Sequence, residues 1–146
     1  MFKRILVATD FSEFAEAALG VGSQLARRLG AELVLLHAFV EMRPYSTAET
    51  ASVQRVYEEQ RLWVQKALDQ RVADASATGL AVRPLLRTGP AADVIADTAR
   101  AEQADLIVVG THGLTGLNRL LLGSVAERVA RLAPCSVLTV KAPEAA

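Results

Sequence analysis

The sequence predicts an α/β fold, an open five-stranded parallel sheet with helices on both faces in a Rossmann-like arrangement. Two observations lead to this prediction. Short apolar runs alternate along the chain with longer amphipathic segments, which is typical of successive β-α-β units. The apolar runs are nearly continuous, as expected for strands buried on both faces. The length of 146 residues suits one domain, so we expect a single domain over residues 1–146.

The strands and helices follow from these runs in chain order. The expected strands are residues 4–8, 32–40, 81–86, 105–109 and 136–140. Pro84 cannot donate a hydrogen bond to a neighbouring strand, so the third strand is expected at an edge of the sheet. The expected helices are residues 13–29, 48–78, 90–103 and 124–132, where apolar residues recur every three or four positions. This spacing places five of the larger apolar side chains toward the core: Tyr57, Trp63, Val125, Val129 and Leu132.

The composition excludes several classes of function. The formal net charge is +0 and basic residues are spread among acidic ones, so we expect no nucleic-acid partner. The one cysteine, Cys135, excludes an internal disulfide and a thiolate-rich metal site. The first apolar run stops at Asp10, and no apolar run approaches the ~18 residues of a membrane span. We therefore expect a cytoplasmic protein that does not enter a membrane.

Residues 110–124, GTHGLTGLNRLLLGS, give the strongest indication of a binding site. They join the fourth expected strand to the fourth expected helix. Glycines there would let the backbone approach a ligand, and the helix amino terminus would offer N–H groups to an anion. A second interpretation stays open, in which the glycines only turn the chain and Ser124 caps the helix with Glu127 in an S-x-x-E capping box.

Two familiar phosphate motifs are absent from the sequence. A Walker A loop needs a lysine, and residues 110–124 contain none. The one G-x-G, at residues 20–22, lies inside a helical pattern and has no third glycine at the dinucleotide-binding spacing. We expect its two glycines to allow close packing of that helix.

The spacing Gly110-x2-Gly113-x9-Gly123-Ser124 fits the nucleotide signature G-x2-G-x9-G-[ST] of the universal stress protein family. The chain resembles that family along its whole length, from KRILVATDFSEFAEAAL to the final SVLTVK. The resemblance implies a sheet of strand order 3-2-1-4-5. In that order strands one and four are neighbours, so residues 8–12 and residues 110–124 would face one crevice.

The resemblance also implies which residues hold ATP, or ADP or AMP, together with Mg²⁺. Asp10 would approach the ribose or a metal-bound water, although it could instead cap the next helix. Arg119 would counter phosphate charge, although a solvated surface arginine is an equal alternative. No residue is expected to bind the metal directly. The implied nucleotide-binding residues are Ala8, Thr9, Asp10, Ala38, Val109, Gly110, Gly113, Arg119, Gly123, Ser124 and Val125.

No catalytic constellation is evident in the sequence, so we predict a regulatory protein of the stress response whose bound nucleotide biases its conformation or its choice of partner. Two alternatives stay open: a dimeric scaffold that needs no nucleotide, and a slow ATPase or phosphotransferase. Family resemblance implies a homodimer formed through residues 136–140, an expected edge strand. His37 is expected to be a satisfied core residue, and His112 a loop residue without a role.

Overall fold

The computed structural model describes residues 1–40, 50–113 and 121–143. These residues form a five-stranded parallel sheet of order β3-β2-β1-β4-β5, which confirms the predicted strand order and places β3, with Pro84, at an edge. Each element lies within two residues of its expected bounds. The strands are β1 Arg4–Ala8, β2 Glu32–Phe39, β3 Val82–Thr88, β4 Leu106–Gly110 and β5 Ser136–Val140. The helices are α1 Glu13–Leu29, α2 Thr50–Ser76, α3 Ala91–Ala101 and α4 Ser124–Leu132.

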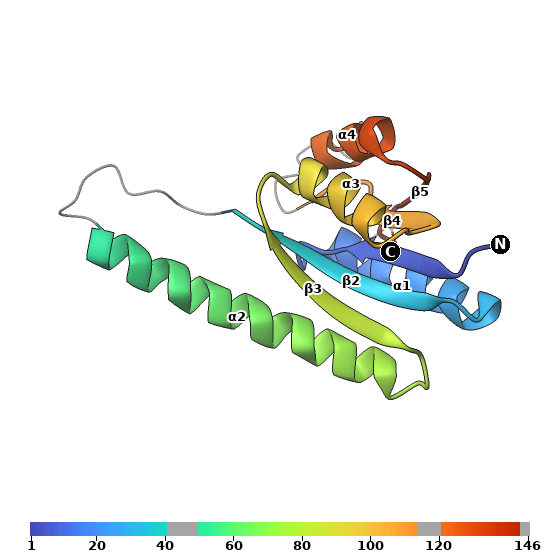
Figure 1. Cartoon of the computed structure of the whole chain (residues 1–146), viewed down its shortest axis with the longest axis horizontal. Helices are drawn as coiled ribbons and strands as arrows, with labels where there is room; N and C mark the ends of the chain where they lie inside the picture. Colours follow the sequence, from blue (N-terminus) through green and yellow to red (C-terminus); the bar gives the residue numbers. More distant parts are fainter. Residues whose placement is uncertain (41–49, 114–120, 144–146) are drawn as a thin grey trace.

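The helices cover both faces of the sheet, and Figure 1 shows α2 and α3 on opposite sides of it. Successive side chains of a strand point to opposite faces, which divides the core into two clusters. Ile5 and Val7 of β1 pack with residues of α1 and α2. Leu6, between them, packs with residues of α3 and α4. All three are fully buried, as the continuous apolar runs predicted.

Helix α1 follows β1 after a short turn and begins at a well-formed cap. The Ser12 side chain accepts a hydrogen bond from the Ala15 N–H, which satisfies one of the free donors at the helix start. The helix ends at Gly30, whose left-handed backbone (φ 65°) suits glycine. Ser12, and not Asp10, is therefore the residue that caps α1.

Three expectations about inward-facing side chains were wrong. Trp63 is 61% exposed, and Val125 and Leu132 are 42% and 39% exposed. Only Val64 and Leu68 are buried in α2, and in α4 the buried residues are Ala126 and Val129. Both helices have one narrow buried stripe, so apolar residues just beside the stripe remain accessible.

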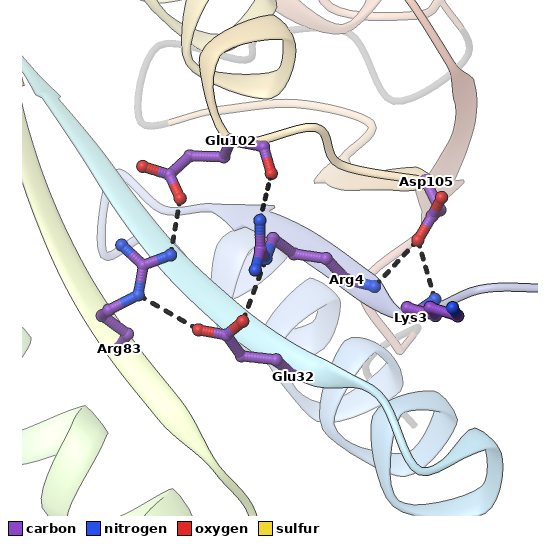
Figure 2. Close-up of polar contacts among 6 residues, drawn as sticks. All are labelled: Lys3, Arg4, Glu32, Arg83, Glu102 and Asp105. Carbon is purple, nitrogen blue, oxygen red and sulfur yellow. Dashed lines mark hydrogen bonds and ion pairs between the residues drawn. The ribbon is translucent and has the colours of Figure 1, made fainter.

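A network of charged side chains joins the amino-terminal ends of the strands, at the edge opposite the loops that follow β1 and β4 (Figure 2). Glu32 accepts hydrogen bonds from Arg4 (2.9 Å) and Arg83 (3.1 Å), and Arg83 also reaches Glu102 at 2.5 Å. Arg4 donates to the Glu102 carbonyl as well. The guanidinium of Arg83 lowers the pKa of both carboxyl groups, so the network is charged at neutral pH and ties β1, β2 and β3 to the end of α3.

Candidate functional site

A pocket opens at the carboxyl ends of β1 and β4, where the order of the sheet reverses. Open parallel sheets bind their ligands at this position. The pocket walls come from β1, β2 and β4, from the loops that follow β1 and β4, and from the first turns of α1, α3 and α4. Its lining residues are Ala8, Thr9, Asp10, Ala15, Ala38, Ala91, Ile95, Val109, Gly110, His112, Gly113 and Val125.

The turn after β1 presents Asp10 to the pocket. One carboxylate oxygen, Oδ1, accepts a hydrogen bond from the Ser12 N–H at 3.0 Å, while Thr9 Oγ1 accepts from the Phe11 N–H at 3.0 Å. The other oxygen, Oδ2, lies against Gly113, because a Cβ atom added to that glycine would come within 2.5 Å of it. Asp10 thus joins the loop after β1 to the loop after β4.

The glycines of the signature have different surroundings. A Cβ at Gly110 would come within 2.8–2.9 Å of Phe14, including its backbone, and one at Gly123 would lie 2.7 Å from the Thr111 carbonyl oxygen. Both positions therefore require glycine because two backbones pass very close together. Gly113 is different, because the atom that a Cβ would meet belongs to a side chain, the Asp10 carboxylate, and not to the backbone.

The start of α4 is held at the pocket by the end of β4. The Gly123 N–H donates to the Thr111 carbonyl at 2.6 Å, and Gly123 is the residue that precedes the helix. Ser124 is consequently the first helical residue, and the expected capping box, with Ser124 as the cap, is wrong: no side chain caps this helix. The first N–H groups of a helix have no acceptor within it and carry its positive dipole end, so this turn can bind an anion.

The two histidines lie on either side of the turn after β1. His112 lines the pocket, where its ring lies 5.1 Å from that of Phe14 and its Nδ1 lies 3.1 Å from Thr111 Oγ1. His37 is half-buried, and its Nδ1 lies 2.7 Å from the Thr9 carbonyl oxygen. A carbonyl can only accept, so Nδ1 carries the proton. Burial lowers the pKa of His37, so the ring is neutral at neutral pH. Its hydrogen bond is satisfied as expected, but the side chain is half-buried and not a full core residue.

Most of the predicted residues meet in this pocket. Those that line it are Ala8, Thr9, Asp10, Ala38, Val109, Gly110, Gly113 and Val125. Gly123 and Ser124 lie directly before Val125 and set the start of α4, and Arg119 lies outside the described residues. Sequence reasoning missed Ala15, Ala91 and Ile95 and assigned no role to His112. Pro90, which directly precedes α3, gave a usable signal for Ala91 because it marks a helix start that faces the same edge of the sheet.

The described part of the chain contains no group of three or more His, Cys, Asp or Glu side chains that could hold a metal ion. Mg²⁺ usually keeps several of its waters when it binds together with phosphate oxygens, and Asp10 is a carboxylate at the pocket that could accept a hydrogen bond from such a water. Within the same described residues, none of the helices combines the length and the apolar character needed to cross a bilayer.

Comparison with known proteins agrees with this architecture. A universal stress protein of Thermus aquaticus is 36% identical over 145 residues, covering 97% of this chain and 100% of that protein. The universal stress protein UspA from Lactobacillus plantarum superposes with a TM-score of 0.86 at 25% identity, covering 95% of this chain and 97% of that one. A universal stress protein solved in complex with cAMP is 27% identical, with a TM-score of 0.74 and coverage of 97% of this chain and 99% of that chain. Residues 1–141 match the universal stress protein family, and the chain belongs to that family.

Proposed function

We propose that the chain is a stress-response regulatory protein that binds ATP with Mg²⁺ and whose conformation or partner binding depends on the bound nucleotide. The observation that carries this proposal is the convergence of Asp10, Gly113 and the first turn of α4 on one pocket at the β1/β4 junction. A related protein was solved with cAMP, which supports an adenine nucleotide as the ligand.

Each part of the pocket suits one part of such a nucleotide. The apolar walls at Ala8, Ala38 and Val109 suit the base, since ligand pockets combine apolar surface with a few polar groups. The N–H groups at the start of α4 suit the phosphates. The Asp10 carboxylate suits a ribose hydroxyl or a water bound to Mg²⁺.

Nucleotide binding, and not rapid turnover, is the activity that this pocket supports. Phosphoryl transfer requires a positioned nucleophile and charge neutralisation around the phosphate. Asp10 and His112 are the titratable side chains of the pocket lining, and the Asp10 carboxylate already accepts a hydrogen bond from the Ser12 N–H, so we propose nucleotide binding without rapid hydrolysis. Phosphate release by wild type well above that of Asp10→Ala and Ser124→Ala variants would instead identify an ATPase.

The decisive experiment is calorimetric titration of nucleotide-stripped protein with ATP and Mg²⁺, alongside a Gly113→Val variant. Valine at position 113 would occupy the space next to Asp10 Oδ2, so it should displace the carboxylate and obstruct the pocket. Gly20→Ala is the matched control, because a Cβ there meets nothing within 4 Å and Gly20 lies outside the pocket lining. Binding by wild type and Gly20→Ala, and its loss in folded Gly113→Val, is the expected result. Equal binding by all three proteins would refute the site. Absence of binding to folded wild type would favour the nucleotide-independent scaffold.

The contribution of the Asp10 charge to Mg²⁺ and ATP binding can be separated from the hydrogen bond that Asp10 makes in the turn after β1. Asp10→Asn keeps an oxygen to accept from the Ser12 N–H but removes the negative charge. We expect this variant to lose most of the Mg²⁺ dependence of ATP binding while it retains the fold. An unchanged Mg²⁺ dependence would show that Asp10 contacts only the sugar or the protein.

We also propose that the protein is a cytoplasmic homodimer, paired through β5. β5 is an edge strand of the sheet, with Ser136 and Thr139 exposed, and an unpaired edge can pair with a second copy across a two-fold axis. Light scattering at micromolar concentration should give the mass of a dimer. A proline in place of Thr139 should shift the protein toward monomer, and a monomeric wild type would overturn this assignment.

A further inference from the structure

The turn after β1 contains an unusual backbone conformation at Phe11. Its φ is 65°, in the left-handed region, which among the described non-glycine residues it shares with Gln103. Bulky residues rarely adopt this conformation, and they persist in it where the surrounding structure holds them. Phe11 lies directly between Asp10, which lines the pocket, and Ser12, which caps α1.

Three side chains enclose the Phe11 ring on the face of the sheet covered by α1 and α2. His37 of β2 stacks on it with ring centroids 4.9 Å apart. The ring of Trp63, from α2, makes a T-shaped contact with centroids 5.5 Å apart and planes at 87°, and the guanidinium of Arg71, also from α2, lies 4.7 Å from the Phe11 ring centroid. Arg71 is in turn anchored to Glu16 of α1 at 2.5 Å.

Trp63 is not explained by core packing, because it is 61% exposed. Its contact with another aromatic ring among the described residues is the one with Phe11. A large, accessible side chain of α2 therefore rests on a residue of the turn that forms the pocket wall.

The hydrogen bonds of the turn connect that contact to the pocket. The Phe11 N–H donates to Thr9 Oγ1 at 3.0 Å, and the His37 ring that stacks on Phe11 donates to the Thr9 carbonyl at 2.7 Å. Thr9 and Asp10 line the pocket. Movement of the Phe11 ring would thus disturb the hydrogen bonds made to the Thr9 hydroxyl and to the Thr9 carbonyl, and with them the direction of the neighbouring Asp10 side chain.

We propose that Phe11 is a positioning residue for the nucleotide site, clamped by Trp63 and Arg71 of α2, and that it couples occupancy of the pocket to the environment of Trp63. This inference rests on the proposed nucleotide function. It goes beyond that function because it identifies α2 as the element whose side chains hold the turn after β1 in place and change environment when nucleotide binds.

Trp63 is the one tryptophan of the chain, so its fluorescence reports directly on the clamp. Addition of ATP and Mg²⁺ to wild type should change its emission, with a midpoint equal to the dissociation constant from calorimetry. Phe11→Leu keeps an apolar side chain but removes the ring. This variant should lose the emission change, and ATP binding should weaken by about tenfold, within the range of coupling between linked residues.

Surface variants keep the test valid if Phe11→Leu fails to fold. Trp63→Ala should also weaken ATP binding severalfold, whereas Trp63→Phe, which restores an aromatic edge, should bind nearly as wild type does. Leu62→Ala is the matched control, because Leu62 is the preceding residue and is 69% exposed. It should leave binding unchanged.

Calorimetry does not depend on Trp63 fluorescence, so the two proposals can fail separately. ATP binding without an emission change, together with wild-type affinity in Trp63→Ala, would overturn the clamp and leave the nucleotide site standing. Absence of calorimetric binding to folded wild type would overturn both. Equal weakening by Trp63→Ala and Leu62→Ala would attribute the effect to α2 in general and refute the specific role of Phe11.

Discussion

Two glycines in α1 should respond in opposite ways to the same substitution. Gly20 is exposed, and a Cβ built there meets nothing within 4 Å. Gly22 is buried, and its Cβ would lie 2.5 Å from Val7 Cγ2. Val7 is fully buried in the central strand β1, so its methyl group has no free space into which to move. Alanine at each position therefore tests how closely α1 approaches the sheet.

The expected magnitudes come from two terms. Alanine is more favourable than glycine in a helix interior by about 1 kcal/mol, so Gly20→Ala should raise the free energy of unfolding by about that amount. Gly22→Ala gains the same helix term but overpacks the core, which costs about 1–3 kcal/mol. The helix term cancels between the two variants, so their difference, about 1–3 kcal/mol, measures the steric cost alone.

Urea denaturation of wild type and both variants measures this difference, provided that the slope of the transition is unchanged. A Val7→Ala variant supplies the control, since it removes the clashing methyl group. Its own destabilisation should be smaller in the Gly22→Ala background than in wild type, which a double-mutant cycle reports as coupling. A Gly22→Ala protein as stable as Gly20→Ala would refute the close helix–sheet contact.

Three further predictions concern other parts of the structure. Glu32→Gln should lower the free energy of unfolding by about 1 kcal/mol near neutral pH. The Glu32 pKa is lowered in the folded state mainly by Arg83, so this loss of stability should be constant above about pH 5 and disappear as the pH falls below about 4. Denaturation curves of wild type and variant recorded across that pH range measure it. Gly110→Ala should cost about 2 kcal/mol or more through its clash with the Phe14 backbone, seen as a lower thermal midpoint. Burial raises the pKa of Cys135, so alkylation of the native protein should reach its half-maximal rate above about pH 8.5, the value for a free thiol, and unfolded protein should show the unshifted profile.

Periodicity and proline placement were sufficient to predict the sheet and its helices. The continuous apolar runs indicated strands buried on both faces, and Pro84 indicated an edge strand. Those features depend on local sequence, because burial and hydrogen-bonding capacity are properties of each segment. The strand order depends on contacts between segments far apart in the chain, and it came from the family resemblance.

The failures at Trp63 and Ser124 have separate physical causes. A helical pattern gives the direction of a side chain only to within about one position around the helix, and α2 buries only Val64 and Leu68. Trp63 lies beside that stripe and contacts Phe11 in the turn after β1. Ser124 was expected to cap α4 because serine favours that position. In the structure the cap is Gly123, one residue earlier, and its N–H donates to the Thr111 carbonyl.

The glycine signature combines packing and chemistry in one segment. Gly110 lets the end of β4 pass against the backbone of α1 at Phe14, and Gly123 lets the start of α4 pass against Thr111 and His112. These two contacts leave little freedom in where α4 begins, and they place its first turn, with Val125, at the pocket. Gly113 then lets the Asp10 carboxylate approach the loop after β4, because a Cβ there would lie 2.5 Å from Asp10 Oδ2. The close backbone contacts at Gly110 and Gly123 thus bring a helix amino terminus to the junction of β1 and β4, where we propose that the phosphates bind.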